Sequence, residues 1–235
     1  MGKKKNMIIP VLPIPDVVFF PNTSLPLYIE ESSYIQMIND CIRDEKPIAV
    51  SLAQPLSGHA IHGKNISKIQ YRPSRISGYG IPIIVEKYEN NAIKILIKGM
   101  GRVKLHELVQ NLPYPCFKAE FLNDLKEDLT YNQDYVDRIN SILQTWISVN
   151  ITNSIEQEAF YSNLKTTSDI VDYVAMLMIH DRDIRQLILE SDSLFEKVSM
   201  VNALLEDTGR HLENIETVNA IKHFEFIEKL SKVAH

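Results

Sequence analysis

The chain has few cysteines and no long apolar segment among its 235 residues. Two cysteines, Cys41 and Cys116, are too few for the disulfide framework of a small secreted protein. Prolines and Asp16 interrupt the longest apolar stretch, which is therefore a poor membrane-spanning segment. The basic start at residues 3–5 leads into proline-containing sequence without the cleavage site of a signal peptide. These absences predict a folded, cytoplasmic protein that does not enter the membrane.

Charge is divided unevenly along the chain. Residues 1–104 contain 14 Lys and Arg against 8 Asp and Glu, whereas residues 105–235 contain 11 against 22. Most of the positive excess lies within residues 64–104, which is interpreted as a solvated face or as a docking surface for an acidic partner or nucleic acid. This predicted basic face consists of Lys64, Lys68, Arg72, Arg75, Lys94, Lys98, Arg102 and Lys104.

Five prolines divide the apolar residues from position 9 to position 29 into short runs. Proline lacks a backbone N–H and biases the preceding residue towards extended geometry, so these runs are predicted to be edge or barrel strands. Alternating apolar residues predict a hairpin of strands at 81–85 and 93–97, and a final strand at 117–121. The sequence therefore predicts a compact, mostly antiparallel β domain over residues 1–124.

Beyond this domain the apolar residues recur every three or four positions, which is the period of amphipathic helices. Residues 125–235 are therefore predicted to form a helical bundle, and the chain is placed in the α+β class. One shorter helix, capped by Ser32 or Ser33, is expected inside the β domain. The predicted helical segments of the bundle are 135–146, 170–178, 184–188, 194–205 with Gly209 as a C-cap, and a terminal amphipathic helix at 211–232.

Two motifs resemble the amino-terminal, substrate-binding domain of the Lon protease family. One is Leu-Pro-x-x-Asp-x-x-x-Phe-Pro at 12–21, followed by Leu-Pro-Leu at 25–27. The other is Ile-Leu-Ile-Lys-Gly-Met-Gly-Arg-Val at 95–103, which is similar to that family's hairpin and its Gly-x-x-Arg ending. The resemblance extends through the helices to about residue 206. It implies a PUA-like barrel packed beside a helical bundle, although Asn90-Asn91 stands where the family often has Asp-Gly.

The motifs for catalysis are incomplete. Residues 58–65 fit a P-loop except that Asn65 replaces the Ser or Thr that would bind magnesium, and the residues that follow do not predict a helix. His59 and His62 lack the further ligands of a tetrahedral zinc site. The ATPase and serine-lysine protease modules of a Lon protease have no counterpart in this sequence. We predict a non-enzymatic protein with no catalytic residue, cofactor or metal.

Three functions remain open at this point. The resemblance to Lon implies a module that binds unfolded or degron-bearing polypeptides through exposed apolar surface and edge strands. The alternative is binding of RNA or other nucleic acid by the basic face, which the overall acidity disfavours. A third is a regulatory subunit that docks on a protease, or on itself, through residues 211–232. The candidate polypeptide-binding residues are Phe19, Phe20, Tyr28, Tyr71 and Tyr79.

Overall fold

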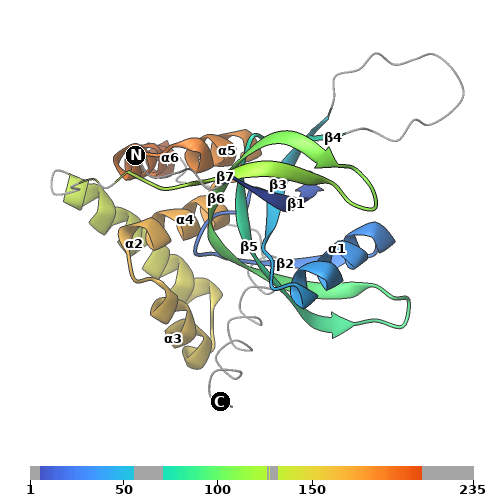
Figure 1. Ribbon diagram of the computed structural model, residues 1–235. Helices are drawn as coiled ribbons and strands as arrows, with labels where there is room; N and C mark the ends of the chain where they lie inside the picture. The colour runs from blue at the N-terminus through green and yellow to red at the C-terminus, as the bar shows by residue number, and fades with distance from the viewer. Residues whose placement is uncertain (1–5, 56–70, 126, 128–131, 208–235) are drawn as a thin grey trace, which may run out of the picture.

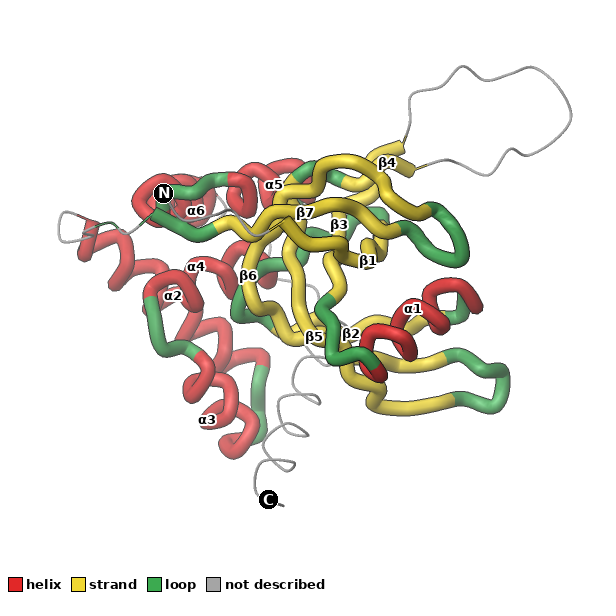
Figure 2. Tube along the Cα trace, viewed as in Figure 1, coloured by secondary structure: helices red, strands yellow, loops and turns green. Residues whose placement is uncertain are grey.

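The computed structural model describes residues 6–55, 71–125, 127 and 132–207. Within these residues seven strands come with six helices, which confirms the α+β prediction. The strands curve into a barrel, with α1 (Ser32–Arg43) on one side and α2 to α6 gathered on the other (Figure 1). Figure 2 shows the same separation of strands and helices along the Cα trace.

The sheet closes because β1 pairs antiparallel with β7 and parallel with β3. The strand order β1-β7-β6-β5-β3-β4 runs round the barrel, and β2 pairs with the first half of β6. Every pairing except β1 with β3 is antiparallel, as the sequence predicted. The strands are β1 (Asn6–Ile14), β2 (Ser24–Ile29), β3 (Ile48–Pro55), β4 (Tyr71–Pro73), β5 (Ile76–Lys87), β6 (Ile93–Gln110) and β7 (Cys116–Leu122).

The proline-rich segment supplies β1, β2 and the connection between them, which crosses the barrel closely. A Cβ atom added at Gly78 would lie 2.0 Å from the carbonyl oxygen of Phe19, so only glycine permits this approach. Phe19 joins the apolar cluster beneath α1, whereas Phe20 joins the cluster formed with the helices. Both rings are therefore buried, and their predicted role as surface contacts for polypeptide is wrong in this conformation.

The predicted hairpin is β5 and β6. Its turn uses Asn91 with a φ of 66°, a left-handed conformation that Asn adopts more readily than most residues. The backbone N–H of Ala92 donates to the Asn90 side chain across this turn. The alternating isoleucines do not mark the buried face of β5, because Pro82 is buried while Ile83 is exposed. Register shifts follow Tyr79 and Ile84 in this strand.

The helices begin and end close to the predicted positions. Thr166 forms a capping box with Asp169 at the start of α4. Helix α3 was not predicted, because Ala159 and Phe160 are the buried residues it contributes and its apolar stripe is weak. Gly209 and residues 211–232 lie outside the described residues. The bundle consists of α2 (Gln133–Asn150), α3 (Ser154–Asn163), α4 (Thr167–Met178), α5 (Arg182–Glu190) and α6 (Leu194–Asp207).

One of the three apolar clusters contains residues of both the barrel and the bundle. Val18, Phe20 and Leu52 from the barrel side belong to the same buried cluster as the inward faces of α2, α4, α5 and α6. Burying apolar surface against both parts stabilises them together. The division into domains at residues 1–124 and 125–235 agrees with the change from strands to helices and stays a prediction.

Arg102 of β6 connects the barrel to the end of α5, and its side chain is only 1% exposed. The guanidinium donates to the carbonyl oxygens of Leu189 at 2.7 Å and Ser191 at 2.8 Å. It also donates to the carboxylate of Asp192 at 2.9 Å and to that of Asp124. Because this side chain is inside the protein, the prediction that Arg102 belongs to a basic face is wrong.

Replacing Arg102 with Met would leave these carbonyl and carboxylate oxygens without their donor. We expect the free energy of unfolding to fall by about 3–5 kcal/mol, as when one partner of a buried ion pair is removed. Arg102→Lys should recover only part of this loss, because an ammonium cannot reproduce the planar fork of donors. Urea unfolding followed by circular dichroism measures both. Lys87→Met, at an exposed position on β5, is the control and should change stability by no more than about 0.5 kcal/mol.

A second buried charge lies next to this network. Lys197 of α6 is 1% exposed and places its ammonium 3.4 Å from the Asp124 carboxylate. Asp172 of α4 is fully buried, and neither of its carboxyl oxygens has a hydrogen-bond partner among the described residues. Burial away from water raises the pKa of Asp172 to about 8. The protonated form keeps a third anion out of a cluster that already balances two cations, Arg102 and Lys197, with two carboxylates.

Asp172 should therefore make stability fall as the pH rises. In the unfolded chain an aspartate loses its proton near pH 4, whereas the folded state keeps this proton to about pH 8. Between these values the unfolded state binds fewer protons, so the free energy of unfolding decreases by up to about 1.4 kcal/mol per pH unit. Asp172→Asn should flatten this slope in urea titrations from pH 4 to pH 8. The exposed Asp134→Asn is the control, and an unchanged slope in Asp172→Asn would contradict the assignment.

Candidate functional site

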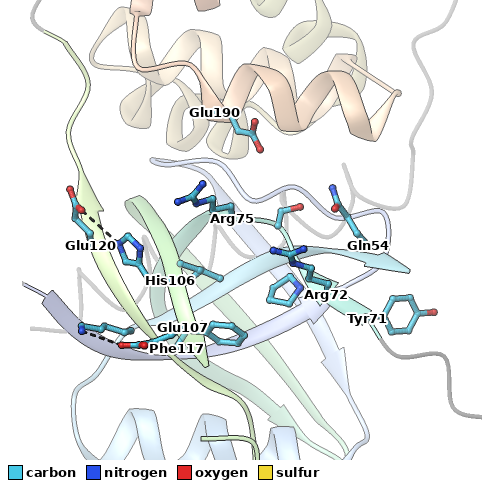
Figure 3. A pocket seen from close by; sticks show the side chains of 13 residues that line it. Gln54, Tyr71, Arg72, Arg75, His106, Glu107, Phe117, Glu120 and Glu190 are labelled. Carbon is cyan, nitrogen blue, oxygen red and sulfur yellow. Dashed lines mark hydrogen bonds and ion pairs between the residues drawn. The ribbon is translucent and has the colours of Figure 1, made fainter. Parts of the chain in front are cut away.

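An open cleft of about 1160 Å³ lies between the barrel and the end of α5. Its walls come from the end of β3, from β4 and the turn after it, from β6 and β7, and from Glu190 of α5 (Figure 3). These segments are far apart in the sequence and meet because the closed sheet places β4 near the β6–β7 pair. The cleft is thus a product of the barrel's closure.

Charged groups on the β6–β7 wall are paired with each other. His106 Nε2 lies 3.7 Å from the Glu120 carboxylate, and Lys118 Nζ lies 3.2 Å from that of Glu107. The His106–Glu120 pair is drawn at the left of Figure 3. At the top of the cleft the Glu190 carboxylate accepts a 2.8 Å hydrogen bond from the Gln186 side chain.

The opposite end of the cleft carries unpaired arginines beside an aromatic ring. Arg72 and Arg75 are exposed, and neither forms an ion pair with any described residue. Tyr71 is 42% exposed next to Arg72, and Phe117 supplies a half-buried ring from β7. The Ser74 hydroxyl in the cleft lining is buried without a hydrogen-bond partner among the described residues. This end combines apolar surface with hydrogen-bond donors that have no partner within the described fold.

A smaller groove of about 290 Å³ lies where the proline-rich segment meets the helices. Val17, Leu25 and Pro26 form its barrel side, and Met176 and Leu177 of α4 contribute to its helical side. Asp16, Ser24, His180 and Arg185 also line it, so this groove between barrel and helices is as polar as it is apolar. Its volume is about a quarter of that of the cleft.

The predicted polypeptide-binding residues do not gather in one place. Tyr71 lines the cleft. Tyr28 is 51% exposed and packs edge-on against Tyr88, with ring centroids 5.3 Å apart, on the β2 side of the barrel. Tyr79 is half-buried against Phe121, with ring centroids 4.9 Å apart.

The predicted basic face is also divided. Arg72 and Arg75 line the cleft, whereas Lys94 and Lys98 lie on the first half of β6 where it pairs with β2. Lys104 is half-buried further along β6. Lys64 and Lys68 lie outside the described residues. Sequence reasoning missed His106, Glu107, Phe117, Lys118, Glu120 and Glu190 as cleft residues, because no local motif marks them.

The described residues offer little for covalent or metal chemistry. Desolvation raises the pKa of the Cys41 thiol to about 12 and also raises the pKa of the Cys116 thiol, so both stay protonated at neutral pH. No cluster of three or more metal-ligating side chains occurs among the described residues. None of the described helices has the length and apolar character needed to cross a membrane. The incomplete P-loop, with His59 and His62, lies outside the described part of the chain.

The architecture defines the chain as a barrel-and-bundle domain of a known kind. The N-terminal domain of Mycobacterium avium complex Lon protease has the same fold with a TM-score of 0.63, at 10% identity, over 86% of this chain and 100% of that one. The Lon N-terminal domain protein from Xanthomonas campestris gives a TM-score of 0.54 at 12% identity, over 84% and 98% of the two chains. At these identities the likeness shows the fold.

Sequence comparison then identifies the family. Residues 8–207 match the ATP-dependent protease La (LON) substrate-binding domain, so the chain belongs to this family, as its motifs predicted. Lon protease of Buchnera aphidicola is 23% identical over 225 residues, which cover 94% of this chain and 27% of that protein. Lon protease of Escherichia coli K12 is 21% identical over 204 residues, which cover 87% and 25%. The chain thus spans about a quarter of the curated relatives it matches, and the family match is to their substrate-binding domain, not to ATPase or protease modules.

Proposed function

We propose that this protein is a non-enzymatic module that binds unfolded or degron-bearing polypeptides in the cytoplasm, and that the cleft between β4, β6, β7 and α5 is where it binds them. The observation that carries the proposal is the cleft itself, on a fold whose family is described by substrate binding. At about 1160 Å³ it exceeds the roughly 300–1,000 Å³ of typical small-molecule pockets. A segment of polypeptide matches this size better than a metabolite does.

The lining of the cleft suits a polypeptide chain. Exposed Tyr71 and the half-buried ring of Phe117 give an apolar surface for side chains. The arginines and Gln54 can donate hydrogen bonds to backbone carbonyl oxygens of an extended segment. Because the cleft is open on one side, it buries only part of such a segment, and the binding is expected to be weak.

We propose a non-enzymatic function for the protein because the described groups that could act as nucleophiles are not activated. His106 is paired with Glu120, and no described Ser, Thr or Cys forms a hydrogen bond with His106. A nucleophile needs such a base or a lowered pKa, whereas the thiols here have raised pKa values. The cleft can hold a chain without cutting it.

Nucleic-acid binding is the weaker alternative. Those lysines and arginines of the predicted basic face that the structure describes lie on different parts of the barrel, and Arg102 is buried. In the cleft Lys118 is already paired with Glu107, and Glu190 adds a negative charge without a cationic partner among the described residues, so a phosphate backbone would find few unpaired cations. Docking on a protease through residues 211–232 stays a prediction, because those residues lie outside the described structure.

Fluorescence anisotropy with a labelled, reduced and alkylated polypeptide that cannot fold tests the proposal. We expect saturable binding with a dissociation constant on the order of tens of micromolar, about −6 kcal/mol. Tyr71→Ala should weaken binding about threefold to tenfold, because it removes an exposed ring from the cleft. Tyr135→Ala is a matched control, since Tyr135 is 44% exposed against 42% for Tyr71 but lies on α2.

Two results would contradict the proposal. One is no binding at several hundred micromolar by a sample whose circular dichroism shows it to be folded. The other is hydrolysis of ATP or of the polypeptide by the purified chain. Equal loss of affinity in Tyr71→Ala and Tyr135→Ala would place the binding outside the cleft.

A further inference from the structure

We propose that the cleft selects polypeptide segments carrying a carboxylate, which Arg72 and Arg75 bind beside the ring of Tyr71. This inference rests on the proposed function and adds the chemical class of the segment that is recognised. The pairing of charges within the cleft supports it. Of the basic side chains that line the cleft, Lys118 and His106 already lie next to Glu107 and Glu120.

Arg72 and Arg75 differ from those residues because the described fold gives them no acidic partner. Both are exposed, and they lie three positions apart on β4 and the turn that follows it. Figure 3 shows Arg72 and Tyr71 at the right of the cleft and Arg75 between them and the two ion pairs. A guanidinium presents a planar fork of donors that matches a carboxylate, and it is less strongly hydrated than an ammonium. An anionic group of a ligand therefore gains the most binding free energy at the two arginines.

The rest of the cleft favours a polypeptide carboxylate over a chain of phosphates. On the β6–β7 wall Lys118 is already paired with Glu107, and the Glu190 carboxylate has no cationic partner among the described residues. A ligand with one charge per nucleotide would therefore find unpaired positive charge only at the two arginines. A polypeptide instead places a single carboxylate at the arginines. Its neutral backbone and apolar side chains can continue past Tyr71 and Phe117.

A set of matched peptides tests the inference with the full chain. Labelled twelve-residue peptides of one apolar and aromatic sequence, blocked at both ends, carry Asp, Asn or Lys at the central position. We expect the Asp peptide to bind about fivefold more tightly than the Asn peptide and the Lys peptide to bind more weakly than both, at low ionic strength. A fourth arm, the Asn peptide with a free carboxyl end, distinguishes a side-chain carboxylate from a chain terminus. Tighter binding of that arm than of the blocked Asn peptide supports carboxylate recognition and assigns it to the terminus.

Substitutions locate the preference. The double variant Arg72→Gln and Arg75→Gln should bind the Asp and Asn peptides with equal affinity, because glutamine can still donate a hydrogen bond to a peptide backbone but carries no charge to bind a carboxylate. Lys87→Gln removes a positive charge from an exposed position of β5 outside the cleft and should keep the preference. Equal unfolding midpoints of all variants in urea show that each remains folded.

The outcomes separate this inference from the proposed function. Equal affinity for the Asp, Asn and free-end peptides overturns the carboxylate preference and leaves polypeptide binding intact. An Asp preference that survives in the double variant overturns the assignment to Arg72 and Arg75. Tighter binding of a single-stranded RNA oligonucleotide, with a steep dependence on salt, overturns the choice of polypeptide. Binding of no ligand at all removes the proposed function and the inference together.

Discussion

The position of the barrel relative to the helices depends on one buried guanidinium. Arg102 on β6 donates to the carbonyl oxygens of Leu189 and Ser191 and to the Asp192 carboxylate at the end of α5. It also donates to the carboxylate of Asp124, which follows β7. A charge buried to this extent is tolerated only when it is fully paired, so the end of α5 has to remain where it is. The interaction fixes the place at which the bundle meets the barrel.

Apolar packing adds to the contact that Arg102 makes between the barrel and the helices. Phe19 and Phe20 are neighbours in the sequence, yet Phe19 belongs to the cluster under α1 and Phe20 to the cluster formed with the helices. This is possible because successive side chains of an extended segment point to opposite sides. Glycine at position 78 lets the segment lie against β5 closely enough to reach both clusters. The proline-rich motif thus connects the two apolar clusters. Its apolar side chains, which suggested a binding surface, pack inside the protein.

The sequence predicted local structure better than it predicted the site. Strands follow from alternation and proline, and the hairpin follows from its turn, because these signals are contained within a few residues. Charge counting failed for Arg102, since composition cannot tell a solvated arginine from one enclosed by carbonyl groups of a distant helix. The cleft is assembled from β3, β4, β6, β7 and α5, so Phe117 and Glu190 come to line one cavity only through the closure of the barrel and the docking of α5 on it. Helix α3 was missed because its sequence carries little periodicity.

The end of α5 has two roles in one turn of chain. Leu189 and Ser191 are held by Arg102, and Glu190 between them forms part of the cleft wall. Helix α5 is also attached to the barrel where the Gln186 side chain donates to the carbonyl oxygen of Ile76 at 2.9 Å. The hydrogen bonds that attach the bundle to the barrel therefore also hold the Glu190 wall of the cleft in position. The shape of the cleft at this wall depends on the contact between barrel and bundle.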